Sequence, residues 1–376
     1  MKAIGVYIYA GGFSIGVRKN FEILAHLEDP KPYGDDAIRM NPEYWGQMPI
    51  HPYPNWPDYF PDFLYANPPC APFSNANTRS FETDSWKNDT RIFCWHNTAK
   101  YAISQKVPFV AIETIPQAYS KAPSFLLEKA EEFSYEGYQV MICLHNAMFM
   151  ESCQNRPRLM FIASKYDIKL AEYSSFPSVT VGIKIDEALP FLNHEHNFYI
   201  KCHEKYRECL EATKQGERLR DSWQRLNPKE NWQLNDSGQV KGRPTFGVKR
   251  LSRDEIMNVI VGYTIIHPTE PRYLSIKEYQ ILGDYPGDYY LPRKPSSQNL
   301  VARGVSSKVG EWIGITAKRT IESATYPMDT NTLIIHDGLQ GWDHRAEYQV
   351  SISPDTKTLP ALGLRTRKTS YKGGQV

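Results

Sequence analysis

The amino-acid sequence predicts an α/β fold built on a mostly parallel β-sheet. Short apolar runs alternate with amphipathic or polar stretches along residues 1–165, and each run is continuously apolar. Such strands, separated by helices, are typical of parallel sheets that helices cover on both faces. The chain has 376 residues, of which 41% are hydrophobic, so it is long enough for one large domain and a smaller one.

Six apolar runs are predicted to be strands and two amphipathic stretches to be helices. The predicted strands are Ile4–Ala10, Phe21–Leu27, Asp62–Ala66, Phe109–Ile115, Gln139–Leu144 and Leu159–Ala163, and the predicted helices are Asn97–Gln105 and Ser124–Phe133. Functional residues in such sheets gather at the carboxyl ends of the strands. A glycine turn, Cys70 and Glu113 all fall at these ends, so we expect them to share one edge of the sheet.

The composition narrows the class of protein. Six cysteines without a Cys-x-x-Cys pattern argue against a disulfide scaffold and indicate a reducing compartment, so we expect a cytoplasmic protein. No run approaches the roughly 18 apolar residues of a membrane span, so we expect no membrane partner. The net charge of +2 neither supports nor excludes a nucleic-acid partner.

The segment Asn67–Ser74 places a cysteine shortly after a predicted strand. Pro68 and Pro69 fix φ and lack a backbone N–H, so the turn is stiff and presents Cys70 instead of burying it. A nucleophilic thiol requires such a setting. Taken alone, a cysteine after a turn is more often an inert, packed side chain.

Further patterns accompany Cys70 in a definite order along the chain. They are the glycine turn Ala10–Gly16, Glu113 within Phe109–Pro116, the run Gln154-Asn155-Arg156-Pro157-Arg158, Arg272–Glu278 with Gly283–Pro286, and Arg303-Gly304-Val305. Together they resemble the DNA cytosine-C5 methyltransferases, over residues 3–165 and 262–315. The resemblance implies a Rossmann-like, S-adenosylmethionine-dependent methyltransferase fold with a smaller target-recognition domain.

The same resemblance suggests where the domains begin and end. We expect a catalytic domain in residues 1–170, a target-recognition domain in 171–260 and a returning part of the catalytic domain in 261–325. Residues 326–376 are expected to be a polar, basic extension that frays. Within the recognition domain, Val179–Ile183 has the pattern of a strand, and residues 201–225 have that of a charged helix.

Four residues are expected to carry the chemistry. Carbon 5 of cytosine becomes nucleophilic when a thiolate adds to C6, and protonation of N3 assists that addition. Cys70 fits the nucleophile and Glu113 the N3 partner, while Arg156 and Arg158 can hold the base and lower the pKa of Cys70. The base must be flipped out, because these atoms are inaccessible in a duplex. Alternatively, Glu113 caps a helix and the arginines are surface cations.

The resemblance implies that S-adenosylmethionine binds between the glycine turn and the second strand. The residues expected there are Tyr7, Gly11, Gly12, Phe13, Glu28, Asp29, Gln47, Pro69, Arg303 and Val305. Glu28 ends the second predicted strand and suits the ribose hydroxyls. The chain departs from the family at Tyr9, where the first glycine of the turn belongs, and at Asp29, where an aromatic residue is usual.

Arg303 is a further departure, because it stands where the family pattern Gly-Asn-x-Val has asparagine. A fixed cation near the transferred group favours an anion. Carboxy-S-adenosylmethionine would supply that anion, so one hypothesis is that the product is 5-carboxymethylcytosine instead of 5-methylcytosine. In the alternative, Arg303 pairs with an acid such as Glu311 or with a DNA phosphate, and the donor is ordinary.

Double-stranded DNA is the expected partner of a monomer that acts in a bacterial or phage-infected cell. The residues expected to contact it are Ser74, Gln154, Lys241, Arg243, Lys249, Arg250 and Arg272. The basic stretch at 241–251 can also be ordinary surface. Two other functions stay open, a non-catalytic DNA-binding module that kept the fold and a tRNA-directed relative with the same catalytic residues.

A group of potential metal ligands occurs in the recognition segment. It comprises His194, Glu195, His196, Cys202, His203 and Cys209. Their spacing matches no common zinc pattern, so we expect a solvated helix and no metal.

Overall fold

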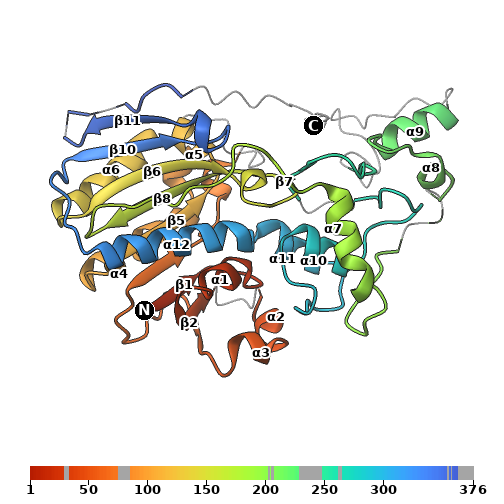
Figure 1. Ribbon diagram of the computed structural model, residues 1–376, viewed down its shortest axis with the longest axis horizontal. Coiled ribbons are helices and arrows are strands. Elements are labelled where there is room, and N and C mark those ends of the chain that lie inside the picture. The colour runs from red at the N-terminus through yellow and green to blue at the C-terminus, as the bar shows by residue number, and fades with distance from the viewer. Residues whose placement is uncertain are drawn as a thin grey trace.

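Nine strands of the protein form one sheet, in the order β11-β10-β6-β8-β5-β4-β1-β2-β3 (Figure 1). The structure is a computed structural model that describes residues 1–28, 34–74, 85–201, 204, 207–227, 248–260, 265–353, 355–356 and 358–362. The strands are β1 (Lys2–Val6), β2 (Glu22–Glu28), β3 (Ile50–Pro52), β4 (Phe63–Ala66), β5 (Phe109–Thr114), β6 (Gln139–Asn146), β8 (Pro157–Ser164), β10 (Thr332–Asp337) and β11 (Ala346–Ser351). Two further strands, β7 (Gln154–Asn155) and β9 (Met257–Asn258), pair with each other.

The prediction of a mostly parallel α/β sheet is confirmed. The pairs β1–β2, β1–β4, β2–β3, β4–β5 and β6–β10 are parallel, whereas β8 runs antiparallel to both β5 and β6, and β11 antiparallel to β10. Every residue of β4, β5 and β6 is buried, as continuously apolar strands require when both faces of a sheet are covered.

The helices of the described residues lie on both faces of the sheet and at one end of the molecule. They are α1 (Gly12–Val17), α2 (Asp35–Arg39), α3 (Pro42–Trp45), α4 (Phe93–Ser104), α5 (Gln117–Lys121), α6 (Pro123–Tyr135), α7 (Val181–Ala188), α8 (Arg207–Ala212), α9 (Leu219–Leu226), α10 (Ile276–Leu282), α11 (Ser297–Arg303) and α12 (Ser307–Ser323). Side chains of α1 and α12 share one hydrophobic cluster, and those of α4 and α6 share another on the opposite face. Helices α8 and α9 lie at one end of the molecule, away from this sheet (Figure 1).

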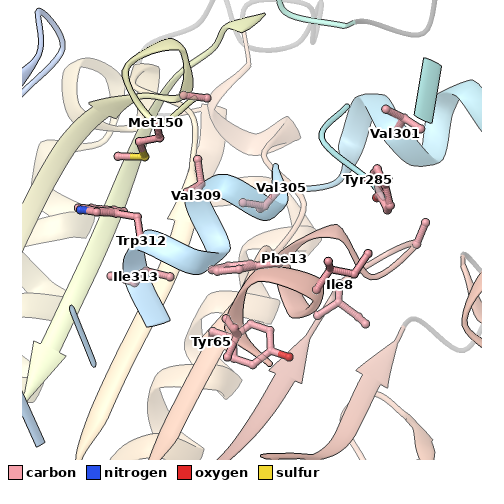
Figure 2. Packing of buried hydrophobic residues seen from close by; sticks show 14 of the residues in the cluster. Ile8, Phe13, Tyr65, Met150, Tyr285, Val301, Val305, Val309, Trp312 and Ile313 are labelled. Carbon is pink, nitrogen blue, oxygen red and sulfur yellow. The ribbon is translucent and has the colours of Figure 1, made fainter. Parts of the chain in front are cut away.

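The contact between α1 and α12 joins the beginning of the chain to its returning part. Figure 2 shows Phe13 of α1 beneath Val305 and Val309, next to Ile313. Glycine permits this close approach. A Cβ on Gly12 would lie 2.4 Å from the carbonyl oxygen of Val305, and one on Gly310 would lie 2.3 Å from that of Phe13. The two helices therefore pack backbone to backbone.

Three expectations drawn from the sequence are wrong. Val179–Ile183 contributes to helix α7 instead of a strand, because Val181, Ile185 and Ala188 form one buried helical face. Residues 201–225 do not form one helix, since α8 ends at Ala212 and α9 begins at Leu219. The extension does not fray throughout, because β10 and β11 join the sheet beside β6.

A search of the described helices finds none that combines the length and the apolar character needed to cross a membrane.

The packing of α1 against α12 predicts opposite effects for two glycines one turn apart. We expect Gly310→Ala to lower the free energy of unfolding by about 1–3 kcal/mol, because its Cβ would overlap the backbone of Phe13. The matched control is Gly314→Ala, whose Cβ would meet its nearest neighbour at 3.5 Å. It should leave stability unchanged or raise it by up to about 1 kcal/mol, through helix propensity. Urea denaturation measures both, and equal losses would contradict the close contact.

Candidate active site

A pocket of about 360 Å³ lies at the sheet edge where β1, β4 and β5 end. Its lining comes from six separate parts of the chain. They are Tyr7 and Tyr9 after β1, Asn67, Pro69, Cys70 and Ala71 after β4, Arg91 in a 3₁₀ turn, Glu113 and Ile115 at the end of β5, Arg156 and Arg158 at the start of β8, and Ala302 and Arg303. The structure thus brings together all four residues expected to be catalytic. Four arginines and one carboxylate line the pocket, so its field is positive.

Cys70 is exposed and immediately precedes a short 3₁₀ turn, Ala71–Phe73. Desolvation by the surrounding protein raises the pKa of its thiol, Arg158 and Arg156 act to lower it, and Glu113 raises it. The arginines therefore act on the Cys70 pKa in the expected direction, but desolvation outweighs them and the net shift is upward.

Glu113 is buried and forms an ion pair with Arg158, whose Nε lies 2.9 Å from Oε1. Burial raises the pKa of the Glu113 carboxyl, although Arg158 and Arg156 oppose the shift. The antiparallel β8 makes this pair possible, because its first residues lie at the edge where β5 ends. The carboxyl is consequently a better proton donor near neutral pH than an ordinary glutamic acid.

Arg156 is almost fully buried, at 4% exposure, and holds the segment that carries Arg303. Its guanidinium donates hydrogen bonds to the carbonyl oxygens of Gly304, at 2.7 Å, and Ala302, at 3.2 and 3.3 Å. Asn67 donates to the carbonyl of Arg303 at 3.0 Å, so three successive carbonyls accept from side chains. Burial, aided by Arg158, lowers the pKa of Arg156 to about 9, which leaves the guanidinium charged at neutral pH.

The residues present fit a donor with a ribose. Gly11 adopts φ +87°, a left-handed conformation that favours glycine, and directly precedes α1. Glu28 ends β2 with 2% exposure, and its Oε1 accepts a hydrogen bond from the Ile8 amide at 2.7 Å. Tyr7 lines the Cys70 pocket. A carboxylate beside a glycine turn, at the carboxyl ends of adjacent parallel strands, is suited to hydroxyl recognition.

The other residues expected at the donor lie in different places. Pro69 lines the pocket, whereas Gly12, Phe13 and Val305 are core residues of the α1–α12 contact, so any contact they make to a donor is through their backbone or is indirect. Gln47 is exposed on the turn after α3 and is not among the residues that line the pocket. Asp29 lies outside the described residues.

Several residues expected at DNA are engaged within the protein. Arg250, at 5% exposure, donates to the carbonyls of Leu210, His267 and Glu270. Arg272 pairs with Glu278 and Glu270, and it lies shortly before helix α10 in the chain. Arg250 thereby joins residues 171–260 to residues 261–325, whereas the ion pairs of Arg272 lie within residues 261–325.

The other residues expected to contact DNA lie in different surroundings. Gln154 is buried, and it donates to the Leu282 carbonyl and accepts from the Ile260 amide. Lys249 pairs with Glu255 at 2.6 Å, and Ser74 directly follows the 3₁₀ turn after Cys70. Lys241 and Arg243 lie outside the described residues.

Potential metal ligands do not gather in the recognition segment as far as it is described. The rings of His194 and His196 lie 5.4 Å apart beside Tyr290, while Cys209 is buried in a small apolar cluster. Cys202 and His203 lie outside the described residues. Another group consists of His96, Glu128 and Glu132, and both of its carboxylates already pair with the ammonium of Lys129.

Six residues of the pocket were not assigned from the sequence, and three of them, Tyr9, Asn67 and Arg91, are polar. Tyr9 was noted only as a departure from the glycine turn, yet its side chain lines the pocket. Asn67 and Arg91 also line it, and Arg91 forms a bidentate ion pair with Asp89. Asn67 could have been found from its place at the end of β4, whereas Arg91 lies in a 3₁₀ turn, Thr90–Ile92, that no apolar pattern marks.

Arg156 clamps residues 302–304 through its hydrogen bonds to their carbonyls. We therefore expect its replacement to destabilise the protein more than replacement of Arg91, another arginine of the pocket. We expect Arg156→Met to lower the free energy of unfolding by roughly 1–3 kcal/mol, because the variant leaves buried carbonyls without donors. Arg91→Met is the matched control, since it removes a half-exposed arginine of the same pocket and should cost at most about 1 kcal/mol. Denaturant unfolding measures both, and a larger loss in Arg91→Met would contradict the clamp.

Comparisons with known proteins agree with this geometry. A family model for C-5 cytosine-specific DNA methylases matches residues 1–313, while no curated protein matches the chain. The fold is similar to that of a DNA modification methyltransferase encoded within a prophage of E. coli, with 19% identity, a TM-score of 0.59, and 86% of this chain and 99% of that one covered.

Two eukaryotic structures share the fold at lower identity. The Entamoeba histolytica methyltransferase EhMeth has 10% identity and a TM-score of 0.54 over 85% of this chain and 98% of its own. A mutant of Spodoptera frugiperda DNMT2 has 13% identity and a TM-score of 0.53 over 84% and 99%. Together with the sequence match over residues 1–313, the sheet and the pocket lead to one conclusion: the chain belongs to the C-5 cytosine-specific DNA methylase family.

Proposed function

We propose that this protein transfers a one-carbon group from an S-adenosylmethionine-type donor to carbon 5 of a cytosine flipped out of double-stranded DNA. The observation that carries the proposal is the convergence of Cys70, Glu113 and Arg158 in one pocket. A nucleophile, a proton donor of raised pKa and a cation are the groups that addition to a cytosine ring requires.

Each residue has a distinct part in the proposed reaction. The Cys70 thiolate forms a bond to C6 while Glu113 holds a proton at N3, which places electron density on C5. Arg158 orients Glu113 through their ion pair, and Arg156 fixes the wall formed by residues 302–304. When bound, the donor supplies the electrophilic carbon. As C5 forms its bond to that carbon, the carbon–sulfur bond of the sulfonium would break and the thioether would leave. The C5 proton would then pass to water, and expulsion of the Cys70 thiolate would restore the aromatic ring.

The raised pKa of Cys70 has a consequence for pH dependence. A thiol with a raised pKa is mostly protonated at neutral pH, so the reactive thiolate fraction grows as pH rises. Glu113, whose pKa is also raised, stays protonated to a higher pH than an ordinary glutamic acid. The rise of the Glu113 pKa widens the pH range in which the carboxyl is protonated, whereas the rise of the Cys70 pKa moves formation of the thiolate to higher pH.

The transferred group has a second candidate, carboxymethyl from carboxy-S-adenosylmethionine, which would give 5-carboxymethylcytosine. Arg303 favours it, because this residue lines the same pocket as Cys70. Glu311, the acid suggested by sequence as its partner, pairs with Lys19 at 2.6 Å. Because Arg303 lines the pocket, its guanidinium is the group that we propose binds the carboxylate of a carboxymethyl group.

The partner and the setting follow from the same proposal. Double-stranded DNA would be read by residues 171–260, acting as the target-recognition domain, and held by basic residues that include Lys241 and Arg243. Residues 1–170 and 261–325 would form the catalytic domain, and residues 326–376 an extension of it. We infer a monomer acting in the cytoplasm of a bacterial or phage-infected cell.

Exchange of the C5 proton tests the role of Cys70. We expect the wild-type protein to exchange the C5 tritium of cytosine in DNA with water, faster as pH rises from 7 to 9, because the addition requires the thiolate. Cys70→Ala should abolish exchange, whereas Cys209→Ala, which alters a buried cysteine outside the pocket, should retain it. Trapping on 5-fluorocytosine DNA should give a covalent adduct with the same dependence. Exchange that survives in Cys70→Ala would exclude the proposed nucleophile, and no adduct with the wild type would favour a non-catalytic DNA-binding module.

Incubation of DNA with both donors identifies the transferred group. We expect nucleoside mass spectrometry to detect 5-methylcytosine with S-adenosylmethionine and 5-carboxymethylcytosine with the carboxylated donor. Arg303→Asn should lower the yield of the carboxymethyl product by about tenfold or more, because it removes a charge-assisted hydrogen bond. Only 5-methylcytosine in every reaction would rule out the carboxymethyl candidate and leave methyl transfer in place.

A further inference from the structure

The turn after β1 holds a tyrosine in a conformation that tyrosine disfavours. Tyr9 has φ +53° and Tyr7 has φ +55°, both in the left-handed region. A side chain with a Cβ is rarely placed there, because the Cβ approaches the backbone carbonyl oxygen. This backbone conformation favours glycine. We therefore expect the side chain of Tyr9 to have a function that offsets the conformational cost.

Neighbouring residues fix the backbone of this turn on both sides. Gly34 packs so closely that a Cβ on it would lie 2.0 Å from the carbonyl oxygen of Tyr9. The Tyr289 hydroxyl donates to the Ala10 carbonyl at 2.7 Å, and the Ile8 amide donates to Glu28 at 2.7 Å. The strained conformation is thus imposed by the surroundings, as is common for residues at functional sites.

The side chain of Tyr9 lines the same pocket as Cys70, Glu113 and Arg303, and it is 8% exposed. Burial raises the pKa of its phenol, with further contributions from Cys70 and Glu28, while Arg303 opposes the shift. The phenol therefore keeps its proton and can donate a hydrogen bond. The backbone that carries Arg303 into the same pocket is held by the bonds that Asn67 and Arg156 make to the carbonyls of residues 302–304.

We propose that Tyr9 and Arg303 form a two-donor receptor for a carboxylate of the sulfonium donor, with Tyr9 as a specificity-determining residue. This inference rests on the proposed transferase function. A phenol and a guanidinium both donate hydrogen bonds, and an ionised carboxylate only accepts them. A methyl group offers no acceptor, so the receptor distinguishes the two transferred groups. The carboxylate belongs to the transferred carboxymethyl group, and the α-carboxylate of the donor is the other source that the test separates.

Competition between the two donors tests the receptor. Wild-type protein, Tyr9→Phe and the control Tyr53→Phe are incubated with DNA and equal concentrations of S-adenosylmethionine and carboxy-S-adenosylmethionine. Tyr53 lies beside Tyr7 but donates its hydroxyl to the Cys94 carbonyl. We expect Tyr9→Phe to lower the ratio of 5-carboxymethylcytosine to 5-methylcytosine by about tenfold, the effect of one hydrogen bond to a charged group. Tyr53→Phe should leave the ratio unchanged.

The other outcomes each decide a separate point. If Tyr9→Phe raises KM for both donors equally and keeps the ratio, the receptor holds the α-carboxylate, which supports the two-donor site and rejects the transferred group as its ligand. If neither the ratio nor KM changes, or if the wild type makes only 5-methylcytosine and KM is unaffected, the receptor is overturned while methyl transfer stands. Donor-free exchange of the C5 proton checks that Tyr9→Phe is folded, and its absence in the wild type would overturn the transferase function itself.

Discussion

The buried guanidinium of Arg156 is the interaction on which the arrangement of the pocket depends. It lies where β7 passes into β8 and binds the carbonyls of Ala302 and Gly304, almost 150 residues later in the chain. Its own backbone is fixed by Asn146 at the end of β6, which accepts from the Arg156 amide at 2.8 Å. One side chain thereby joins strands from the first half of the chain to residues 302–304 at the pocket. Only arginine has several donors that point along different directions from a planar group, and this makes the joint specific.

The direction of β8 determines the chemistry of the pocket as much as the residue types do. In an antiparallel strand the first residues lie beside the last residues of its neighbours, so Arg158 starts β8 where Glu113 ends β5. A parallel strand would have carried Arg158 to the opposite edge. The single reversal within the central strands therefore brings a cation to a carboxyl that would otherwise be buried without a counter-charge.

Sequence patterns were sufficient to find the candidate site residues that lie at the end of a predicted strand or just after it. Cys70 and Glu113 follow strands that are continuously apolar, and such strands can be recognised without knowledge of their neighbours. Arg250 and Gln154 show the limit of this reasoning, because the carbonyls and amides that they bind come from distant segments. The helix α7 is another case, since the β-branched run that suggests a strand is overridden by a buried face of spacing three and four. The net direction of the Cys70 pKa also depends on burial, which no local pattern reports.

The extension beyond the family match has a consequence for how the protein can be divided. Strand β10 pairs with β6 in parallel, and β11 pairs with β10, so both lie outside residues 1–313 yet complete the same sheet. Farther along, Leu359 and Leu362 pack against the hydrophobic cluster of that sheet, and Tyr119 donates to the Pro360 carbonyl. A fragment cut at the family boundary would expose the edge of β6 along residues 140–144, which is a template for association between chains. The smallest piece that can be handled as an independent protein therefore extends to about residue 362, well past the last residue of the pocket.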